Sequence, residues 1–282
     1  MSLKIDNPIV SVDWLKDHLK DDNLIVLDCT IPKVTAQATS EIEEQKVQIK
    51  GAILFDIKNT FSDITANFPN TVLTPNEFEQ KAQELGINSD SAIVCYDDFG
   101  MYSSPRVWWN FRLMGFNNIA VLDGGLPKWK SNDLPIEFPQ KNQLSKGNFK
   151  VSYQSEKLKH TKDVLLAIEN KDILIADARS KGRFFGTERE PREDVKSGHI
   201  PNSVSLPFNS VIDNDLFKSK EALKLVFNTI NPDNKTLIFS CGSGITASVL
   251  ALAAEVSGNK SYAVYDGSWT EWGSTEGLPI EI

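Results

Sequence analysis

The chain repeats its own sequence pattern at about half of its length of 282 residues. Residues 122–125, Leu-Asp-Gly-Gly, recur at 265–268 as Tyr-Asp-Gly-Ser, a shift of 143 residues. Further on, Leu-Pro-Ile-Glu occurs at both 134–137 and 278–281, a shift of 144 residues. A duplicated domain explains two matches at nearly the same shift better than chance does. Two domains also agree with the usual domain size of roughly 100–200 residues.

Each half alternates short apolar runs, typical of buried strands, with helical patterns. We expect strands at 24–28, 52–55, 92–96, 119–122, 173–177, 203–206, 236–240 and 262–265, and helices at 74–85, 105–114 and 247–255. This alternation predicts an α/β fold, with a mostly parallel sheet flanked by helices in each domain. The expected bounds are 8–138 for the first domain, 139–152 for a polar linker, and 153–282 for the second domain.

The charge balance limits the partners of the protein. Lys and Arg number 30 against 38 Asp and Glu, a formal net charge of −8 at pH 7. This acidity argues against a non-specific binder of nucleic acid or of an anionic membrane. No apolar run approaches the ~18 residues of a membrane-spanning helix, and residues 1–12 lack the apolar core of a signal peptide. We therefore expect a cytoplasmic location without membrane or nucleic-acid partners.

Three cysteines are spread widely along the chain, at Cys29, Cys95 and Cys241. An odd number without a Cys-x-x-Cys pair indicates neither a disulfide framework nor a thiolate zinc site. The three histidines are too far apart in sequence to form a recognisable metal-binding motif. We expect no metal and no cofactor.

One of these cysteines, Cys241, directly follows an expected strand and begins the sequence Cys-Gly-Ser-Gly-Ile-Thr before an expected helix. Open α/β sheets bind ligands at the carboxyl ends of their strands. Two glycines around a small residue let backbone N–H groups point into one anion-binding nest, and the helix adds the positive end of its dipole. A thiol there is expected to ionise more readily than a free cysteine and to act as a nucleophile. The alternative is a buried structural cysteine beside a structural glycine turn.

The two copies differ at this loop, because Asp98 stands in the first copy where Cys241 stands in the second. Cys-dependent phosphatases also place a cysteine in such a nest, and they close it with an arginine six residues later. Here that residue is Ala247, so no guanidinium neutralises a bound phosphate dianion. Phosphate hydrolysis is therefore disfavoured. A non-catalytic binding module with an unreactive cysteine stays open.

Four segments together resemble the tandem rhodanese sulfurtransferases. They are the Cys241 loop, Tyr-Asp-Gly-Ser-Trp-Thr-Glu-Trp-Gly at 265–273, Ser-Pro-Arg-Val-Trp-Trp at 104–109, and Gly-His-Ile-Pro at 198–201. The resemblance covers roughly residues 10–282. It implies two rhodanese-like domains, of which the first is inactive and the second carries the catalytic cysteine.

The loop resembles that of the family branch acting on 3-mercaptopyruvate, which carries Gly-Ser-Gly after the cysteine. The branch that prefers thiosulfate usually carries Arg and Lys there and stays the alternative. For the mercaptopyruvate type, the resemblance implies that Arg183 and Arg192 bind the substrate, and guanidinium groups bind carboxylates bidentately. The family further implies a thiol or cyanide as sulfur acceptor, with thioredoxin among the candidates.

Within the loop, the resemblance implies catalytic roles for the Cys241 thiol and the Ser243 hydroxyl. The remaining loop positions, whose backbone is expected to contact substrate, are Gly242, Gly244, Ile245 and Thr246. We expect a sulfur atom to move from the donor to Cys241 as a persulfide, and from there to the acceptor.

The chain departs from the family pattern at one position. The family commonly carries an Asp, matched here by Asp63, and seven residues later a His proposed to form a relay with Ser243. This chain has Asn70 instead. An amide cannot accept and return a proton near neutral pH as imidazole can. Asp63 is retained as an accessory candidate, with a turn or helix-capping role as the alternative.

Overall fold

The computed structural model describes residues 2–33, 46–140 and 144–282, and its contacts divide the chain into two compact units. Unit 1 comprises Met1–Phe61 and Leu73–Tyr153. Unit 2 comprises Ser62–Val72 and Gln154–Ile282. The short segment Ser62–Val72 therefore belongs to unit 2, although it lies in the first half of the sequence.

The stretch expected as a linker, 139–152, packs on unit 1 in its described part, and residues 141–143 lie outside the described residues. The Gly147 N–H donates to the Gln83 carbonyl oxygen at 2.8 Å, and the Phe149 N–H donates to the Ile87 carbonyl oxygen at 3.0 Å. The Phe149 side chain is fully buried. The segment runs along unit 1 in extended form without joining a sheet, which explains why its sequence lacks a strand or helix period.

Unit 1 is built on a five-stranded sheet in which all neighbours are parallel. In spatial order the strands are β1 (Ile9–Val10), β6 (Ile119–Leu122), β5 (Ala92–Tyr96), β2 (Leu24–Asp28) and β4 (Ile53–Leu54). Its helices are α1 (Val12–His18), α2 (Pro75–Glu84), α3 (Ser104–Leu113) and α4 (Gly125–Ser131). The short strands β3 (Gln48–Ile49) and β7 (Ile136–Glu137) form a separate antiparallel pair.

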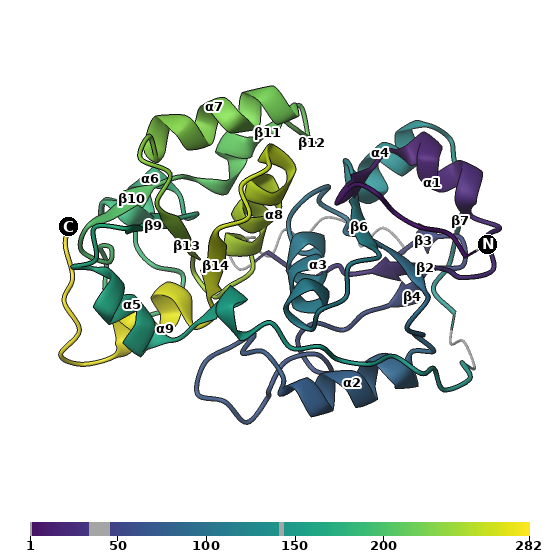
Figure 1. Ribbon diagram of the computed structural model, residues 1–282, viewed down its shortest axis with the longest axis horizontal. Coiled ribbons are helices and arrows are strands. Elements are labelled where there is room, and N and C mark those ends of the chain that lie inside the picture. The colour runs from purple at the N-terminus through teal and green to yellow at the C-terminus, as the bar shows by residue number, and fades with distance from the viewer. Residues whose placement is uncertain (1, 34–45, 141–143) are drawn as a thin grey trace. The chain divides into compact units, whose positions relative to one another are not determined.

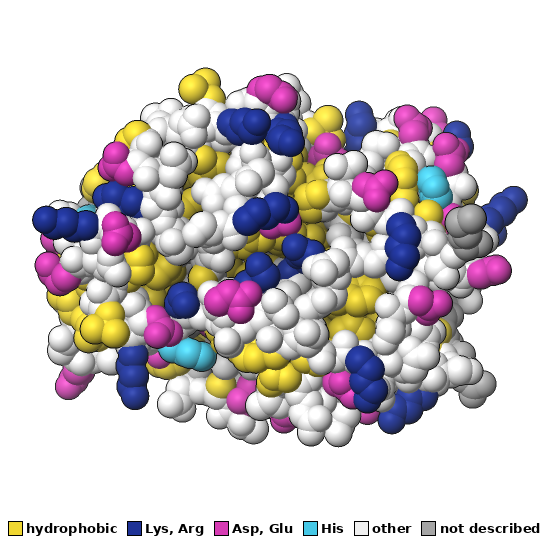
Figure 2. All heavy atoms as spheres, in the orientation of Figure 1, with side chains coloured by type: hydrophobic (Ala, Val, Ile, Leu, Met, Phe, Trp, Pro, Cys, Tyr) yellow, Lys and Arg dark blue, Asp and Glu magenta, His cyan; other side chains and the backbone are white. Residues whose placement is uncertain are grey.

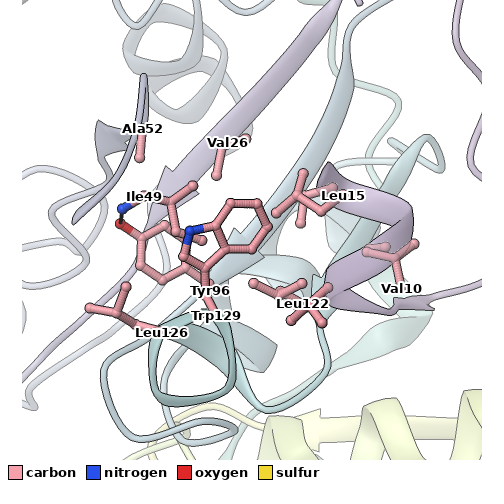
Figure 3. Close-up of a cluster of buried hydrophobic side chains, with 12 residues drawn as sticks. Val10, Leu15, Val26, Ile49, Ala52, Tyr96, Leu122, Leu126 and Trp129 are labelled. Carbon is pink, nitrogen blue, oxygen red and sulfur yellow. Dashed lines mark hydrogen bonds between the residues drawn. The ribbon is translucent and has the colours of Figure 1, made fainter. Parts of the chain in front are cut away.

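The two faces of this sheet carry different cores. On one face, α1 and α4 contribute Leu15, Leu126 and Trp129 to a cluster with Tyr96 (Figure 3). The Tyr96 hydroxyl accepts a hydrogen bond from the Ile49 N–H at 3.1 Å within this cluster. The helices α2 and α3 bring an aromatic cluster together, which consists of Phe55, Phe61, Phe78, Phe111, Phe116 and Phe149.

Unit 2 also contains a five-stranded sheet with only parallel neighbours. In spatial order the strands are β10 (Ser203–Ser205), β9 (Ile173–Asp177), β13 (Thr236–Ser240), β14 (Tyr262–Tyr265) and β8 (Leu158–Lys159). Its α-helices are α5 (Thr161–Ala167), α6 (Lys181–Phe184), α7 (Lys220–Ile230), α8 (Ala247–Ser257) and α9 (Ser268–Ser274) (Figure 1). Two 3₁₀ turns, Ser155–Lys157 and Phe208–Val211, and the antiparallel pair β11 (Ile212–Asp213) and β12 (Leu216–Phe217) complete it.

The central strand β13 is buried on both faces, because its successive side chains alternate between two cores. Ile238 packs in a cluster with Trp269 and Trp272 of α9. Its neighbour Phe239 points to the other face, where its ring lies 6.2 Å from that of Phe227 on α7. A continuous apolar run is typical of parallel strands covered by helices on both faces.

The two sheets have the same topology, which is the structural counterpart of the repeated sequence pattern. Read as β8-β14-β13-β9-β10, the second sheet matches β1-β6-β5-β2-β4 strand for strand. The predicted α/β fold with mostly parallel sheets is confirmed. The strand predictions for β2, β5, β6, β9, β13 and β14 agree with the observed bounds. The predicted helix at 74–85 is α2, which begins after Thr74 with the expected capping box to Glu77.

The surface drawn in Figure 2 intersperses acidic and basic side chains and shows no broad expanse of a single sign. Within the described residues, no helix combines the length and the apolarity needed to cross a bilayer.

Candidate active site

Cys241 lies immediately after the central strand β13 and is almost completely buried, with 1% of its surface exposed. Its backbone is tied to the start of α9 on both sides. The Cys241 N–H donates to Ser268 Oγ at 3.2 Å, and the Trp269 N–H donates to the Cys241 carbonyl oxygen at 2.9 Å. These bonds fix the cysteine backbone at the carboxyl end of the sheet, which is the position that the sequence predicted.

The Ser268 hydroxyl lies close to the thiol, with Oγ 4.0 Å from Cys241 Sγ. The hydroxyl donates its proton to the Tyr265 carbonyl oxygen at 2.7 Å, which leaves its oxygen to accept from the Cys241 N–H. Ser268 also adopts a positive φ of 51°, which is uncommon for a residue with a side chain. Its role is therefore to hold the cysteine backbone.

The loop between Cys241 and α8 turns sharply at Gly244, whose φ is +79°. The Ser248 hydroxyl donates to the Gly244 carbonyl oxygen at 3.0 Å and fixes the turn to the first residues of α8. Within the described chain, the backbone N–H groups of Gly242, Ser243 and Ile245 donate to no protein acceptor. Unused N–H groups next to a helix N-terminus form a site for a negative charge.

Both predicted arginines contact this loop or its direct support. The Arg183 guanidinium lies against Gly242, because a Cβ placed on that glycine would be 3.2 Å from Nη2. Arg192 Nη1 donates to Thr270 Oγ1 at 3.1 Å, and the Thr270 hydroxyl in turn donates to the Gly242 carbonyl oxygen. The structure therefore brings one guanidinium against Gly242 and links a second, through the Thr270 hydroxyl, to the Gly242 carbonyl oxygen.

Glu190 holds the orientation of Arg183 through a bidentate ion pair. Its other partner is Arg179, whose Nη1 lies 2.8 Å from Oε1. Arg179 is fully buried between Glu190 and Asp177, and it stacks over the Trp269 ring at 4.3 Å. Burial alone would lower the pKa of Arg179, but the carboxylates of Asp177 and Glu190 raise it. A lone arginine is usually a solvated surface charge, and Arg179 departs from this pattern because it is part of a buried ion network.

The departure from the family pattern, Asn70, is in contact with the loop. Its Nδ2 donates to Ser243 Oγ at 3.0 Å and to the Ser243 carbonyl oxygen at 3.3 Å. Asp63 is directed elsewhere, since its Oδ1 accepts from both the N–H and the hydroxyl of Thr65 at 2.9 and 2.6 Å. These bonds lower the pKa of Asp63, with the Thr65 hydroxyl contributing most. This geometry corresponds to the turn-forming alternative for Asp63.

In unit 1 the corresponding loop, after β5, holds an internal anion. Asp97 Oδ2 accepts from the N–H groups of Tyr102, Ser103 and Ser104 at 2.8–3.0 Å, and its Oδ1 accepts from the Phe99 N–H. Four backbone N–H groups of this loop are therefore already occupied by a carboxylate. The first copy has Asp98 in place of the cysteine, and an internal carboxylate fills most of its loop.

Three residues of the site were missed by the sequence analysis: Ser268, Thr270 and Glu190. Ser268 and Thr270 lie in the segment 265–273, which resembles the family sequence. The resemblance therefore pointed to this segment but not to the contacts of these two residues. Glu190 lies between two arginines in sequence, which is a signal for an ion network. Among the described residues no cluster of three or more His, Cys, Asp or Glu side chains could hold a metal ion.

Comparison with known proteins shows the family of the chain. The family model described as "Rhodanese-like domain" matches residues 11–132 and 160–275. The chain is 37% identical to 3-mercaptopyruvate sulfurtransferase of Mus musculus over 94% of this chain and 91% of that protein. It is 36% identical to thiosulfate sulfurtransferase of Rattus norvegicus, with the same coverage of 94% and 91%. It also matches the crystal structure of the 3-mercaptopyruvate sulfotransferase SseA from Escherichia coli with a TM-score of 0.80 and 31% identity, covering 93% of this chain and 99% of that one.

Proposed function

The chain belongs to the rhodanese family of sulfurtransferases, and we propose that it moves sulfur from 3-mercaptopyruvate to a thiol or cyanide through a persulfide on Cys241. The observation that carries this proposal is the pairing of two guanidinium groups, of Arg183 and Arg192, with the loop that holds the cysteine. A donor with a carboxylate and a ketone needs positive charge beside the thiol, and this loop contributes none of its own.

In the first half-reaction, the Cys241 thiolate attacks the sulfur atom of 3-mercaptopyruvate. An S–S bond forms and the C–S bond breaks, and its electron pair passes to carbon to give the enolate of pyruvate. The enolate takes up a proton and leaves as pyruvate, while Cys241 keeps the sulfur as a persulfide. The carbon that loses sulfur is reduced by the electron pair of the C–S bond, while the cysteine and donor sulfurs are together oxidised to the persulfide. No external oxidant or reductant is therefore needed.

Arg183 and Arg192 would hold the substrate carboxylate and stabilise the negative charge that develops on the enolate oxygen. Arg183 already pairs with Glu190, and this pair orients its guanidinium before substrate arrives. The unused N–H groups of Gly242, Ser243 and Ile245 would stabilise the negative charge on sulfur, together with the Ser243 hydroxyl. The backbone of Gly244 and Thr246 completes the proposed contact surface of the loop.

In the second half-reaction, a thiolate or cyanide attacks the outer sulfur of the persulfide. The S–S bond breaks and Cys241 leaves as a thiolate, ready for another donor. Thioredoxin as the physiological acceptor and a cytoplasmic location are predictions from the sequence. A pull-down of the persulfide form with reduced thioredoxin, followed by sulfide detection, tests the first of them.

Thiosulfate is the second candidate donor, and the 36% identical thiosulfate sulfurtransferase of rat supports it. Thiosulfate is a dianion, and the family branch that prefers it carries basic side chains next to the cysteine. At Gly242 a side chain would meet the Arg183 guanidinium, which favours the mercaptopyruvate type. Comparing kcat/KM for the two donors in the wild type and in Gly242→Arg with Ser243→Lys separates the candidates.

The decisive experiment is the intact mass of the protein after exposure to 3-mercaptopyruvate. We expect one added sulfur atom on the wild type and none on Cys241→Ser. The matched control is Cys95→Ala, which removes a buried thiol of unit 1 and should leave sulfur uptake unchanged. An unmodified wild-type mass, or an added sulfur that survives in Cys241→Ser, would exclude the proposed mechanism.

A further inference from the structure

Asn70 reaches the proposed active-site loop from a distant part of the sequence. It lies in the segment Ser62–Val72, which belongs to the same unit as Cys241. Its Nδ2 is 3.0 Å from Ser243 Oγ and 3.3 Å from the Ser243 carbonyl oxygen. Asn70 and Ser243 are both buried, with 9% and 5% of their surfaces exposed. The hydroxyl of Ser243 therefore receives a hydrogen bond that its own loop does not provide.

The Ser243 carbonyl determines which end of the Asn70 amide faces the loop. A carbonyl oxygen only accepts hydrogen bonds, so the atom 3.3 Å away has to be the NH₂ group and not the amide oxygen. The same NH₂ group donates to Ser243 Oγ. Because that oxygen accepts from Asn70, the single proton of the Ser243 hydroxyl is left to donate to another group.

The backbone holds Asn70 in a conformation that suits asparagine. Its φ is +63°, in the left-handed region that asparagine tolerates better than most residues. The segment is closed by a bond from the Asp63 N–H to the Thr71 carbonyl oxygen at 2.8 Å. It is anchored by a bond from the Val72 N–H to Asp266 Oδ2 at 2.9 Å, two residues before Ser268. The Asn70 amide is therefore fixed relative to the elements that hold Cys241.

We propose that Asn70 is a positioning residue that directs the Ser243 hydroxyl proton toward the sulfur bound at Cys241, an inference that rests on the function proposed above. An amide neither releases nor takes up a proton near neutral pH. The contact therefore orients a hydrogen bond donor and transfers no proton. Stabilisation of the negative sulfur by an oriented donor requires no reorganisation during the reaction.

The substitution Asn70→Asp tests the direction of this hydrogen bond, because it preserves shape and tolerates the same φ. An ionised carboxylate accepts from Ser243 where the amide donates, so the Ser243 proton turns away from the sulfur. We expect persulfide formation to slow by about a hundredfold at pH 8. Acidification protonates the carboxyl and restores a donor, so the ratio of variant to wild-type rate rises as pH falls. The neighbouring charged groups, Asp63, Asp266, Arg183 and Arg192, are common to both proteins, so the ratio isolates residue 70.

The matched variant Asn70→Gly removes the amide and keeps the left-handed backbone accessible. We expect it to lower the rate about tenfold, independently of pH, with the KM for donor within about twofold of wild type. In a Ser243→Ala background, both substitutions at position 70 should lose their effect, because the residue acts through the hydroxyl. If Asn70→Asp does not fold, Asn70→Gly in the two backgrounds carries the same comparison.

Two results would overturn the inference while leaving the proposed function intact. In the first, the wild type forms the persulfide, but the ratio of the Asn70→Asp rate to the wild-type rate does not change with pH. The other is an effect of either substitution that persists in Ser243→Ala. A wild type that takes up no sulfur from 3-mercaptopyruvate would instead overturn the proposed function, and the inference with it.

Discussion

The Arg183 guanidinium occupies the space beside Gly242 in which a side chain would stand. A Cβ built on Gly242 would lie 3.2 Å from Arg183 Nη2, which is closer than most real Cβ contacts. Gly242 does not have a positive φ, so this glycine is not required by backbone conformation. The requirement for glycine comes instead from the approach of the arginine, which links the loop sequence to the carboxylate binding proposed for Arg183.

We predict that Gly242→Ala impairs donor binding by pushing Arg183 away by a few tenths of an ångström. Since Arg183 is held by Glu190, it cannot retreat freely. The expected loss is about tenfold in kcat/KM for 3-mercaptopyruvate, mainly through a higher KM. Steady-state kinetics measures it. In an Arg183→Ala background the same alanine should cost nothing further, and an equal additional loss there would disprove the steric explanation.

A second prediction concerns Glu190, the shared carboxylate of Arg179 and Arg183. Glu190→Gln leaves the buried Arg179 with Asp177 as its remaining carboxylate partner. Removing one member of a buried ion network costs about 3 kcal/mol in the free energy of unfolding. Equilibrium denaturation in urea measures this loss. The control is Lys81→Gln, which breaks the exposed pair with Glu84 and should leave the urea midpoint unchanged. An equal shift of the midpoint in both variants would count against the network.

A third prediction concerns the first copy of the domain. Placing a cysteine at position 98 in a protein without Cys241, as Asp98→Cys with Cys241→Ser, should not create a second persulfide site. Four backbone N–H groups of that loop donate to the Asp97 carboxylate, so these groups are not free to stabilise a negative sulfur. Intact mass after exposure to 3-mercaptopyruvate is the measurement, with Cys241→Ser alone as the reference. Stoichiometric sulfur uptake by the double variant would show that a free nest is unnecessary.

A fourth prediction follows from the environment of Asp98. Burial and the neighbouring charge of Asp28 raise the pKa of Asp98. The folded state then binds a proton more readily than the unfolded state, so this group makes stability fall as pH rises through the raised pKa. Asp98→Asn should therefore increase the unfolding midpoint at pH 7, and the increase should vanish in acid below the unfolded-state pKa of Asp.

The control for this pH dependence is Asp63, whose pKa is lowered by its bonds to Thr65. A lowered pKa in the folded state contributes stability at neutral pH that is lost on acidification. Asp63→Asn should thus reduce the midpoint at pH 7 and approach the wild type in acid, opposite in sign to Asp98→Asn. Urea midpoints measured between pH 3 and pH 7, about the range of carboxyl titration, test both signs. The same sign for the two variants would contradict the assignment.

Most of the fold could be predicted from the sequence, because buried parallel strands are continuous apolar runs with clear boundaries. β13 is an example, since Leu237, Ile238 and Phe239 are all buried on one face or the other. The segment 139–152 was harder to interpret, because its backbone bonds to loops of unit 1 and leaves no periodic pattern. The membership of Ser62–Val72 in unit 2 was equally hidden, since no local signal reports a contact between distant segments.

Candidate site residues could be proposed from the sequence where the residue type itself indicates the chemistry. The proposal of Cys241 rests on its place after a strand and before a helix, and the proposal of Arg183 and Arg192 rests on the resemblance. Contacts that depend on side-chain direction could not be predicted. The resemblance implied that position 70 lies near Ser243, but not that the Asn70 amide donates to the Ser243 hydroxyl, nor that Asp63 turns toward Thr65.

The segment Ser62–Val72 also limits how the polypeptide can be divided into its two repeats. A polypeptide cut at the stretch between the repeats would give a second half that lacks Asn70 and the anchor to Asp266. The copy that carries Asp98 in place of a cysteine therefore cannot be discarded without removing part of the surroundings of Ser243. The half of the sequence without Cys241 thus contributes structure to the unit that carries it.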